Sequence, residues 1–200
     1  MEKKELIKYI VITSINEPTE GVVLFSQKKD YKVLVIGDKK TPVDWFCKNV
    51  EYVSIIDQSK LEFELEKKLP YNHYCRKMLG YLLAIQNGAD IIVDTDDDNI
   101  PKENWVFPNL EAEFDLVEEN MGFINIYQLY TEQKIWTRGL PLKLISTSFD
   151  LENKIKKEKS KVGVWQGLAD EDPDVDAIYR LTNDTPCYFN NRLPIVLGNG

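Results

Sequence analysis

The chain reads Ile91-Ile92-Val93-Asp94-Thr95-Asp96-Asp97-Asp98-Asn99 at the point where a short apolar run gives way to a cluster of carboxylates. The three apolar residues are β-branched, a type enriched in buried strands. Pro101 follows shortly afterwards and closes the turn. Ligands of open α/β sheets bind at the carboxyl ends of the strands, so this run predicts a functional site at the end of a buried strand.

Earlier apolar runs have the same form. Residues 8–16 are a nearly continuous β-branched run, which predicts a strand buried on both faces. Residues 31–36 form a second run that ends at Gly37-Asp38, and residues 50–56 form a third that ends at Asp57. The segment between the first two strands, from about 19 to 29, is long enough for a crossover helix. These runs predict a βαβ arrangement.

The clearest helical pattern lies just before Asp94-Thr95-Asp96-Asp97-Asp98, which we call the acidic run. In residues 72–87 the apolar positions recur at helical spacing, and Asn87-Gly88 supplies a C-terminal stop. These apolar positions are Met78, Leu79, Leu82, Leu83 and Ile85. The second half of the chain is less regular. It predicts a strand at 122–127, a solvated lysine-rich segment at 151–162, and either a helix or a strand at 177–182.

Composition excludes several classes of function. A chain of 200 residues with 43% hydrophobic content predicts one globular domain. The net charge of −8 provides no basic surface for nucleic acid or for an anionic membrane. Three cysteines without a CxxC pair indicate neither a disulfide framework nor a zinc site. The cysteine pattern fits a reducing compartment, so we expect a cytoplasmic location. The N-terminus has charges of both signs and no long apolar stretch, and no run of 18 apolar residues occurs, so we expect no signal peptide and no membrane span.

The acidic run itself suggests a bound cation. The adjacent carboxylates of Asp96, Asp97 and Asp98 repel one another unless a cation or a hydrogen-bond network compensates their charge. Carboxylate oxygens suit Mg²⁺ or Mn²⁺, and Mg²⁺ is often held by one or two carboxylates together with substrate phosphates. A divalent ion that bridges the protein to a diphosphate is therefore the functional prediction.

The acidic run has two other interpretations, an EF-hand loop and a solvated turn. Asp94, Asp96 and Asp98 match positions one, three and five of an EF-hand loop, but Asn99 stands where that loop needs glycine and Trp105 where it needs glutamate. A solvated acidic turn is the remaining alternative. The sequence also lacks a phosphate-binding Gly-Lys-Ser/Thr loop and a GxGxxG dinucleotide motif.

Two further groups are candidates for function. Arg76 and Lys77, near the start of the predicted helix, would attract a diphosphate or merely solvate one face. A second acidic cluster offers a general base or a nucleophile, with a surface loop turned by Pro173 as its alternative. Its candidate catalytic residues are Asp172, Asp174 and Asp176.

Together these patterns resemble GT-A type glycosyltransferases, and within that superfamily the STELLO-like glycosyltransferases. The resemblance is weaker to the reversibly glycosylated polypeptides that act as UDP-arabinopyranose mutases. It extends from about Lys8 to Gly200 and is carried by the helix from Arg76-Lys77 to Gly80-Tyr81, by Asp94-Thr95-Asp96-Asp97-Asp98-Asn99-Ile100-Pro101, and by Asp174-Val175-Asp176-Ala177-Ile178-Tyr179-Arg180-Leu181.

The resemblance implies an α/β fold, a three-layer α/β/α sandwich with a mostly parallel central sheet. It also implies metal ligation of Mn²⁺ or Mg²⁺ by Asp96 and Asp98, with Asp94-Thr95-Asp96 as an open alternative register. Nucleotide contacts are implied for Thr13, Asn16, Asp38, Arg76, Asp96 and Asp97. Similar families continue past this point, so the end at Gly200 suggests a minimal version of the family or a truncated chain.

The predicted function is transfer of a sugar from a nucleotide-sugar, expected to be UDP-linked, to a hydroxyl acceptor of unidentified class. A UDP-sugar mutase of the same fold is one alternative. A non-catalytic protein that binds nucleotide-sugars or acts as a scaffold is the other. Turnover of the donor separates the transferase from the binding protein.

Overall fold

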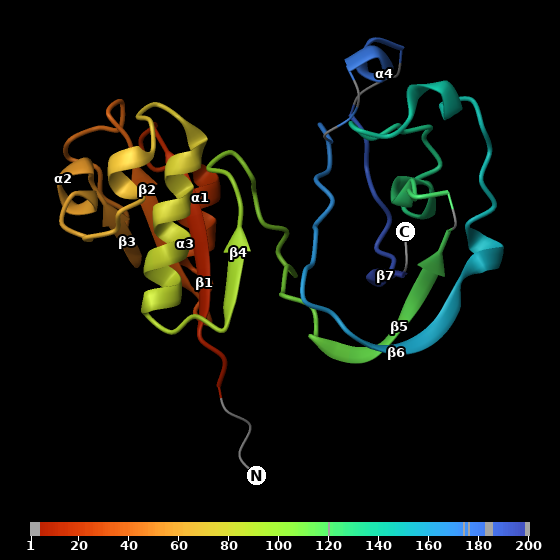
Figure 1. The fold of residues 1–200 in the computed structure, drawn as a ribbon, viewed down its shortest axis with the longest axis horizontal. Coiled ribbons are helices and arrows are strands. Elements are labelled where there is room, and N and C mark those ends of the chain that lie inside the picture. Colours follow the sequence, from red (N-terminus) through yellow and green to blue (C-terminus); the bar gives the residue numbers. More distant parts are fainter. Residues whose placement is uncertain (1–4, 120, 174, 176, 183–185, 199–200) are drawn as a thin grey trace. The chain divides into compact units, whose positions relative to one another are not determined.

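The computed structural model describes residues 5–119, 121–173, 175, 177–182 and 186–198. The chain divides into two compact units, Met1–Trp105 (unit 1) and Val106–Gly200 (unit 2), which Figure 1 shows in the colours of the sequence. Each unit has its own sheet and its own hydrophobic clusters. The single-domain organisation stays a prediction.

Unit 1 is built on a parallel sheet of four strands in the order β3-β2-β1-β4. Because all four strands run the same way, their carboxyl ends meet at one edge of the sheet, which we call the carboxyl edge. The predicted βαβ arrangement and mostly parallel sheet are confirmed. The strands are β1 (Lys8–Ser14), β2 (Lys32–Gly37), β3 (Val50–Val53) and β4 (Ile91–Asp94).

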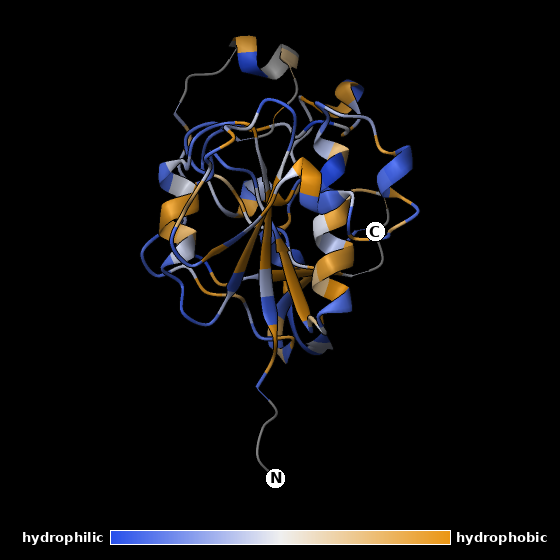
Figure 2. Ribbon diagram, turned by 90° about the vertical axis from the view of Figure 1, so that its left-hand side faces the viewer, coloured by the Kyte–Doolittle hydropathy of each residue, from blue (hydrophilic) through white to orange (hydrophobic). Residues whose placement is uncertain are grey.

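Helices cover both faces of this sheet, so unit 1 has three layers. Helix α1 (Glu20–Ser26) packs on one face, where its Val22 and Phe25 join alternate residues of β1 and β2. Helix α3 (Lys77–Gln86) packs on the other face, where its Leu83 joins the intervening residues of the same strands. Figure 2 shows the apolar strands with helices on both sides. The α/β sandwich of GT-A type is therefore confirmed for this unit.

Local signals set the element ends. Thr19 caps α1 by accepting a hydrogen bond from the backbone N–H of Val22. The predicted third strand stops at Val53 rather than 56, because Ser54 caps the short helix α2 (Ile55–Gln58). The predicted helix 72–87 starts at Lys77 and is preceded by the 3₁₀ turn η2 (Tyr74–Arg76). Another 3₁₀ turn, η1 (Glu66–Lys68), lies between α2 and η2.

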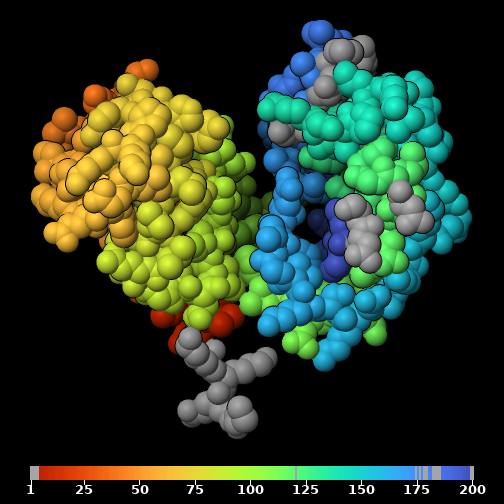
Figure 3. Space-filling view, viewed as in Figure 1, coloured from red at the N-terminus to blue at the C-terminus, as the bar shows by residue number. Residues whose placement is uncertain are grey.

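The apolar residues of α3 differ in burial. Leu79 and Leu83 are buried, but Met78 and Ile85 are 44% and 60% exposed. Residues 77–86 of α3 are yellow to yellow-green in the space-filling view of Figure 3 and lie at the surface of unit 1. An apolar residue at helical spacing is therefore not by itself a core residue.

Unit 2 contains a sheet of three strands in the order β6-β5-β7. Strand β5 (Glu111–Glu118) pairs antiparallel with β6 (Lys156–Lys161) and parallel with β7 (Ile195–Gly198). Residues 177–182 form the helix α4 (Ala177–Thr182), which settles the choice that the sequence left open. Three 3₁₀ turns complete the described part of the unit: η3 (Ile126–Leu129), η4 (Leu142–Leu144) and η5 (Glu152–Lys154).

One prediction for unit 2 was wrong and another was incomplete. The predicted strand at 122–127 is a turn at Gly122, with φ of 79°, followed by η3. The lysine-rich segment 151–162 is solvated as expected but contains β6, whose lysines pair with carboxylates of β5. Lys157 lies 2.6 Å from Asp115 and Lys159 lies 3.0 Å from Glu111.

Candidate functional site

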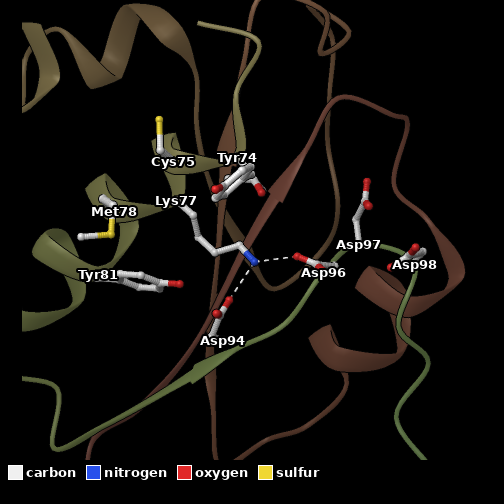
Figure 4. Close-up of a pocket in the computed structure, with 10 residues that line it drawn as sticks. Tyr74, Cys75, Lys77, Met78, Tyr81, Asp94, Asp96, Asp97 and Asp98 are labelled. Atoms are coloured by element: carbon white, nitrogen blue, oxygen red, sulfur yellow. Dashed lines mark hydrogen bonds and ion pairs between the residues drawn. The ribbon is translucent and has the colours of Figure 1, made fainter. Parts of the chain in front are cut away.

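The acidic run lines a pocket at the carboxyl edge of unit 1. The cavity has a volume of about 670 Å³. One wall is formed by the end of β1 and the residues that follow β4, and the other by η2 and α3, as Figure 4 shows. The lining residues are Thr13, Asp94, Asp96, Asp97 and Asp98 on the first wall, and Tyr74, Cys75, Lys77, Met78 and Tyr81 on the second.

Lys77 joins the two walls. Its Nζ lies 2.7 Å from Asp94 Oδ1, 2.7 Å from Asp96 Oδ1 and 2.9 Å from the backbone oxygen of Thr95. Burial disfavours its charged form, but the hydrogen bonds and charges of Asp94 and Asp96 more than offset this, so the pKa of Lys77 is raised. The ammonium group therefore stays charged, and Figure 4 shows it between the two carboxylates.

Tyr81 supports the same corner of the pocket. Burial raises the pKa of its phenol, and the nearby charge of Asp94 and a hydrogen bond to that carboxylate raise it further. The phenol therefore remains protonated and donates to Asp94. Asp94 is thus engaged by both Lys77 and Tyr81.

Asp97 ties the acidic run to the elements on its other side. Its Oδ2 accepts hydrogen bonds from Ser14 Oγ at 2.5 Å and from Asn16 Nδ2 at 3.0 Å. Its backbone oxygen accepts a hydrogen bond from the hydroxyl of Thr19, the cap of α1. The Asn16 backbone oxygen in turn accepts a hydrogen bond from Trp45 Nε1 at 3.0 Å. Asp97 therefore fixes the loop after β1 against the acidic run.

Asp98 is the exception within the run. It is exposed and lines the pocket. Its carboxylate makes no hydrogen bond or ion pair with any other residue that the structure describes. It is therefore the carboxylate of the run that remains available for a ligand.

The donor set fits a hard divalent ion that a phosphate helps to hold. Among the described residues, no group of three or more His, Cys, Asp or Glu side chains could hold a metal by itself. One or two carboxylates are enough when phosphate oxygens complete the coordination sphere of Mg²⁺. Asp98 and the exposed Asp96 can supply those carboxylates.

The other predicted nucleotide-binding residues differ in position. Thr13 lines the pocket. Asp38 is buried, and its carboxylate accepts hydrogen bonds from the backbone N–H groups of Lys39 at 2.7 Å and His73 at 3.3 Å. Asn16 is exposed and uses its amide on Asp97. Nucleotide contacts by these residues stay predictions.

Arg76 does not line the pocket. It is 1% exposed, and its guanidinium donates to Gln58 Oε1 at 2.8 and 2.6 Å, to Glu66 Oε1 at 3.0 Å and to the backbone oxygen of Leu69 at 3.1 Å. It also lies over the ring of Tyr71, 4.3 Å from the centroid. Of the two predicted diphosphate-binding residues, Lys77 therefore reaches the pocket, whereas the donors of Arg76 are used inside the protein.

The aromatic and sulfur-containing wall of the pocket was not predicted. Tyr74, Met78 and Tyr81 are spaced four and three residues apart, which places them on one helical face. Tyr74 is largely exposed and stacks on His73, with 4.4 Å between ring centroids. The spacing alone could have identified this face, but it predicts a core face equally well.

The second acidic cluster belongs to unit 2. Asp172 is exposed and forms a two-point ion pair with Arg180, at 2.7 and 3.1 Å. Asp174 and Asp176 lie outside the described residues. Catalytic roles for these three aspartates stay predictions.

Comparison with known proteins identifies two similar glycosyltransferases. No family model matches the chain. It is 31% identical over 191 residues to the probable glycosyltransferase STELLO2 of Arabidopsis thaliana, and 30% identical over 191 residues to the probable glycosyltransferase STELLO1 of the same plant. Each alignment covers 89% of this chain. Over the aligned residues the chain is similar to the STELLO-like glycosyltransferases.

The chain spans about a quarter of the length of these curated relatives, since each alignment covers 25% of the relative. Within the described residues, no helix is long and apolar enough to cross a membrane.

Proposed function

We propose that this STELLO-like chain is a metal-dependent glycosyltransferase that binds a UDP-linked sugar and transfers the sugar to a hydroxyl acceptor. One observation carries the proposal. The acidic run lines a pocket at the carboxyl edge of a parallel sheet, and the carboxylate of Asp98 is not engaged by other described residues. Nucleotides bind at this edge in open α/β sheets.

Four residues of the pocket have a task in this proposal. Asp98 and Asp96 would hold Mn²⁺ or Mg²⁺, which would supply positive charge to the departing diphosphate. Asp97 keeps the run against the end of β1 through Ser14. The exposed face of Tyr74 offers an apolar surface to the ribose or the base.

A binding protein without turnover is the second candidate, and one observation favours it. Among the described residues that line the pocket, the only carboxylates are those of the acidic run. A separate general base would have to come from elsewhere, such as the second acidic cluster. A cytoplasmic location also stays a prediction.

Calorimetric titration of UDP and a panel of UDP-sugars, with and without Mn²⁺, tests the proposal. We expect UDP to bind much more tightly with Mn²⁺, and we expect Asp98→Asn to weaken both ion and nucleotide binding. The matched control is Asp30→Asn, an exposed carboxylate that precedes β2 at the opposite edge of the sheet. If Asp98→Asn keeps the full Mn²⁺-dependent affinity for UDP, the assignment of this ligand is wrong.

A further inference from the structure

Lys77 carries a positive charge at a position where positive charge is unfavourable. It is the first residue of α3, and the N-terminal end of a helix carries partial positive charge. The first turn of α3 contains no acidic residue, and no side chain caps the helix. The residue is also 8% exposed, so its charge has lost most of its contact with water. Placements that violate a local rule in this way tend to occur at functional sites.

The compensation comes from the acidic run. A lysine ammonium has three donors, and the three oxygen atoms 2.7, 2.7 and 2.9 Å away, from Asp94, Asp96 and Thr95, can accept all of them. Lys77 therefore occupies a cage of oxygen atoms, as a bound cation would. The two carboxylates come from the end of β4 and the lysine from α3, so this contact closes the pocket corner across 17 to 19 residues of sequence.

The same carboxylates remain open to solvent on their other side. The side chains of Asp94 and Asp96 are 60% and 69% exposed, whereas that of Lys77 is 11% exposed. An ion from solution can therefore approach Asp96 without passing Lys77. Since Asp98 is unengaged and two residues away, an ion held by Asp98 would draw on the same carboxylate that Lys77 holds.

We propose that Lys77 is a positioning residue that acts as a built-in counter-cation: it holds Asp94 and Asp96 in place when no ion is bound, and it competes with a divalent ion for Asp96. The competition with a divalent ion rests on the proposed function, because it assumes that an ion binds the run. The positioning of Asp94 and Asp96 by Lys77 concerns the protein alone. Lys77 thus keeps the acidic pocket assembled before a donor arrives.

The test uses the whole chain with Lys77→Met, and with Lys77→Gln as a second variant that fills the site with a neutral donor. Without divalent ions, we expect both variants to melt roughly 2–6 °C below the parent, and we expect added NaCl to narrow the gap by screening the carboxylates. The matched control is Lys60→Met, which removes a lysine from the exposed pair with Asp57 at 2.9 Å. An exposed pair contributes little, so the control should melt within about 2 °C of the parent.

Ion titration gives a readout that a merely structural lysine would not change. Without nucleotide, Mn²⁺ should bind Lys77→Gln roughly thirtyfold more tightly than the parent, the effect of removing one positive charge at about 4 Å from a divalent ion in watery surroundings. Mn²⁺ should also raise the melting temperature of this variant more than that of the parent. If Mn²⁺ binds Lys77→Gln and the parent with equal affinity, Lys77 does not compete with the ion. If the Lys77 variants melt at the same temperature as Lys60→Met, Lys77 does not act as a counter-cation.

These outcomes are separable from failure of the proposed function. If the parent binds no UDP with Mn²⁺, the transferase proposal fails, while the melting comparison still decides the role of Lys77. If the parent binds UDP with Mn²⁺ and Lys77→Gln behaves like the parent throughout, the transferase proposal stands and the role of Lys77 is overturned.

Discussion

Four aspartates within five positions have four different surroundings. Asp94 is held by Lys77 and Tyr81, and Asp96 by Lys77 alone. Asp97 is held by Ser14 and Asn16, and Asp98 makes no such contact with the described residues. Mutual repulsion in the run is thus relieved in part by a lysine and in part by neutral donors. One carboxylate is left for a ligand.

Asp38 provides a test at this scale, because its carboxylate is buried and accepts hydrogen bonds from two backbone N–H groups. Asp38→Ala leaves both groups without this acceptor, so we expect it to lower the free energy of unfolding by about 1–3 kcal/mol. Asp38→Asn retains one acceptor oxygen, so its free energy of unfolding should fall less. Urea unfolding of the three proteins measures the effect.

The opposite result would restore the sequence-based assignment. If Asp38→Ala unfolds like the parent but binds UDP more weakly by about 1.5–3 kcal/mol, the range for hydrogen bonds to charged groups, Asp38 contacts the nucleotide. UDP titration with Mn²⁺ distinguishes the two cases.

The sequence predicted that the acidic run is the site but not which carboxylate is free. The partners of Asp97 are Ser14 and Asn16, 83 and 81 residues away, so no local pattern reveals them. Arg76 and Lys77 are adjacent and of like charge, yet one is buried among Gln58 and Glu66 and the other reaches the pocket. The start of α3 at Lys77 separates them, and helix starts are hard to place from sequence.

At the scale of elements, α1 and the acidic run approach each other closely because of one glycine. A Cβ atom on Gly21 would lie 2.2 Å from the backbone oxygen of Asn99 and 3.1 Å from that of Asp97. Both neighbours are backbone atoms, which cannot rotate away as a side chain can. The position of the run therefore depends on the absence of a side chain at this point of α1.

Gly21→Ala should accordingly displace the run. Alanine favours a helix by about 1 kcal/mol over glycine, but we expect overpacking of about 1–3 kcal/mol or more to outweigh this gain. The variant should unfold at lower urea concentration and bind Mn²⁺ and UDP more weakly. Gly163→Ala is the control, because a Cβ there meets nothing within 4 Å. A more stable Gly21→Ala protein would mean that the loop yields without strain.

Strands buried on both faces were predictable, and strands at a solvated edge were not. The cores of β1 and β2 are continuous apolar runs, and a parallel sheet covered by helices on both faces requires that pattern. Strand β6 reads Lys-Lys-Glu-Lys-Ser-Lys and is largely exposed, so its pairing with β5 depends on cross-strand charges rather than on apolar alternation. Such a segment has the composition of a loop.

At the scale of the whole molecule, net charge matters for the proposed donor. The chain carries a net charge of −8, and a nucleoside diphosphate is itself an anion. Long-range attraction cannot bring such a donor to the protein. Local positive charge at the pocket would therefore have to favour binding, and we propose that the divalent ion supplies it, because the donors of Lys77 are taken by Asp94, Asp96 and Thr95. This is why we expect nucleotide binding to depend strongly on the ion.

The last prediction concerns the carboxylate that acts as general base in sugar transfer. Transfer to a hydroxyl needs a carboxylate that accepts its proton, and the second acidic cluster supplies three candidates. The three variants are Asp172→Asn, Asp174→Asn and Asp176→Asn. At one of these positions we expect the variant to bind donor within a few fold of the parent while its turnover falls by roughly 10²–10⁴. Asp98→Asn should instead weaken donor binding itself. Glu132→Gln, an exposed carboxylate of unit 2 without a partner among the described residues, is the control.

Asp172 has a particular feature in this series, because both oxygen atoms of its carboxylate are engaged by Arg180 and are less free to accept a proton from a hydroxyl. Arg180→Gln should therefore raise turnover if Asp172 is the base and leave turnover unchanged if Asp174 or Asp176 is. Steady-state transfer and hydrolysis of UDP-sugars, measured beside calorimetric donor affinity, distinguish these cases. Normal turnover in all three aspartate variants would show that the base lies elsewhere. Donor binding without turnover in the parent would favour the binding protein over the transferase.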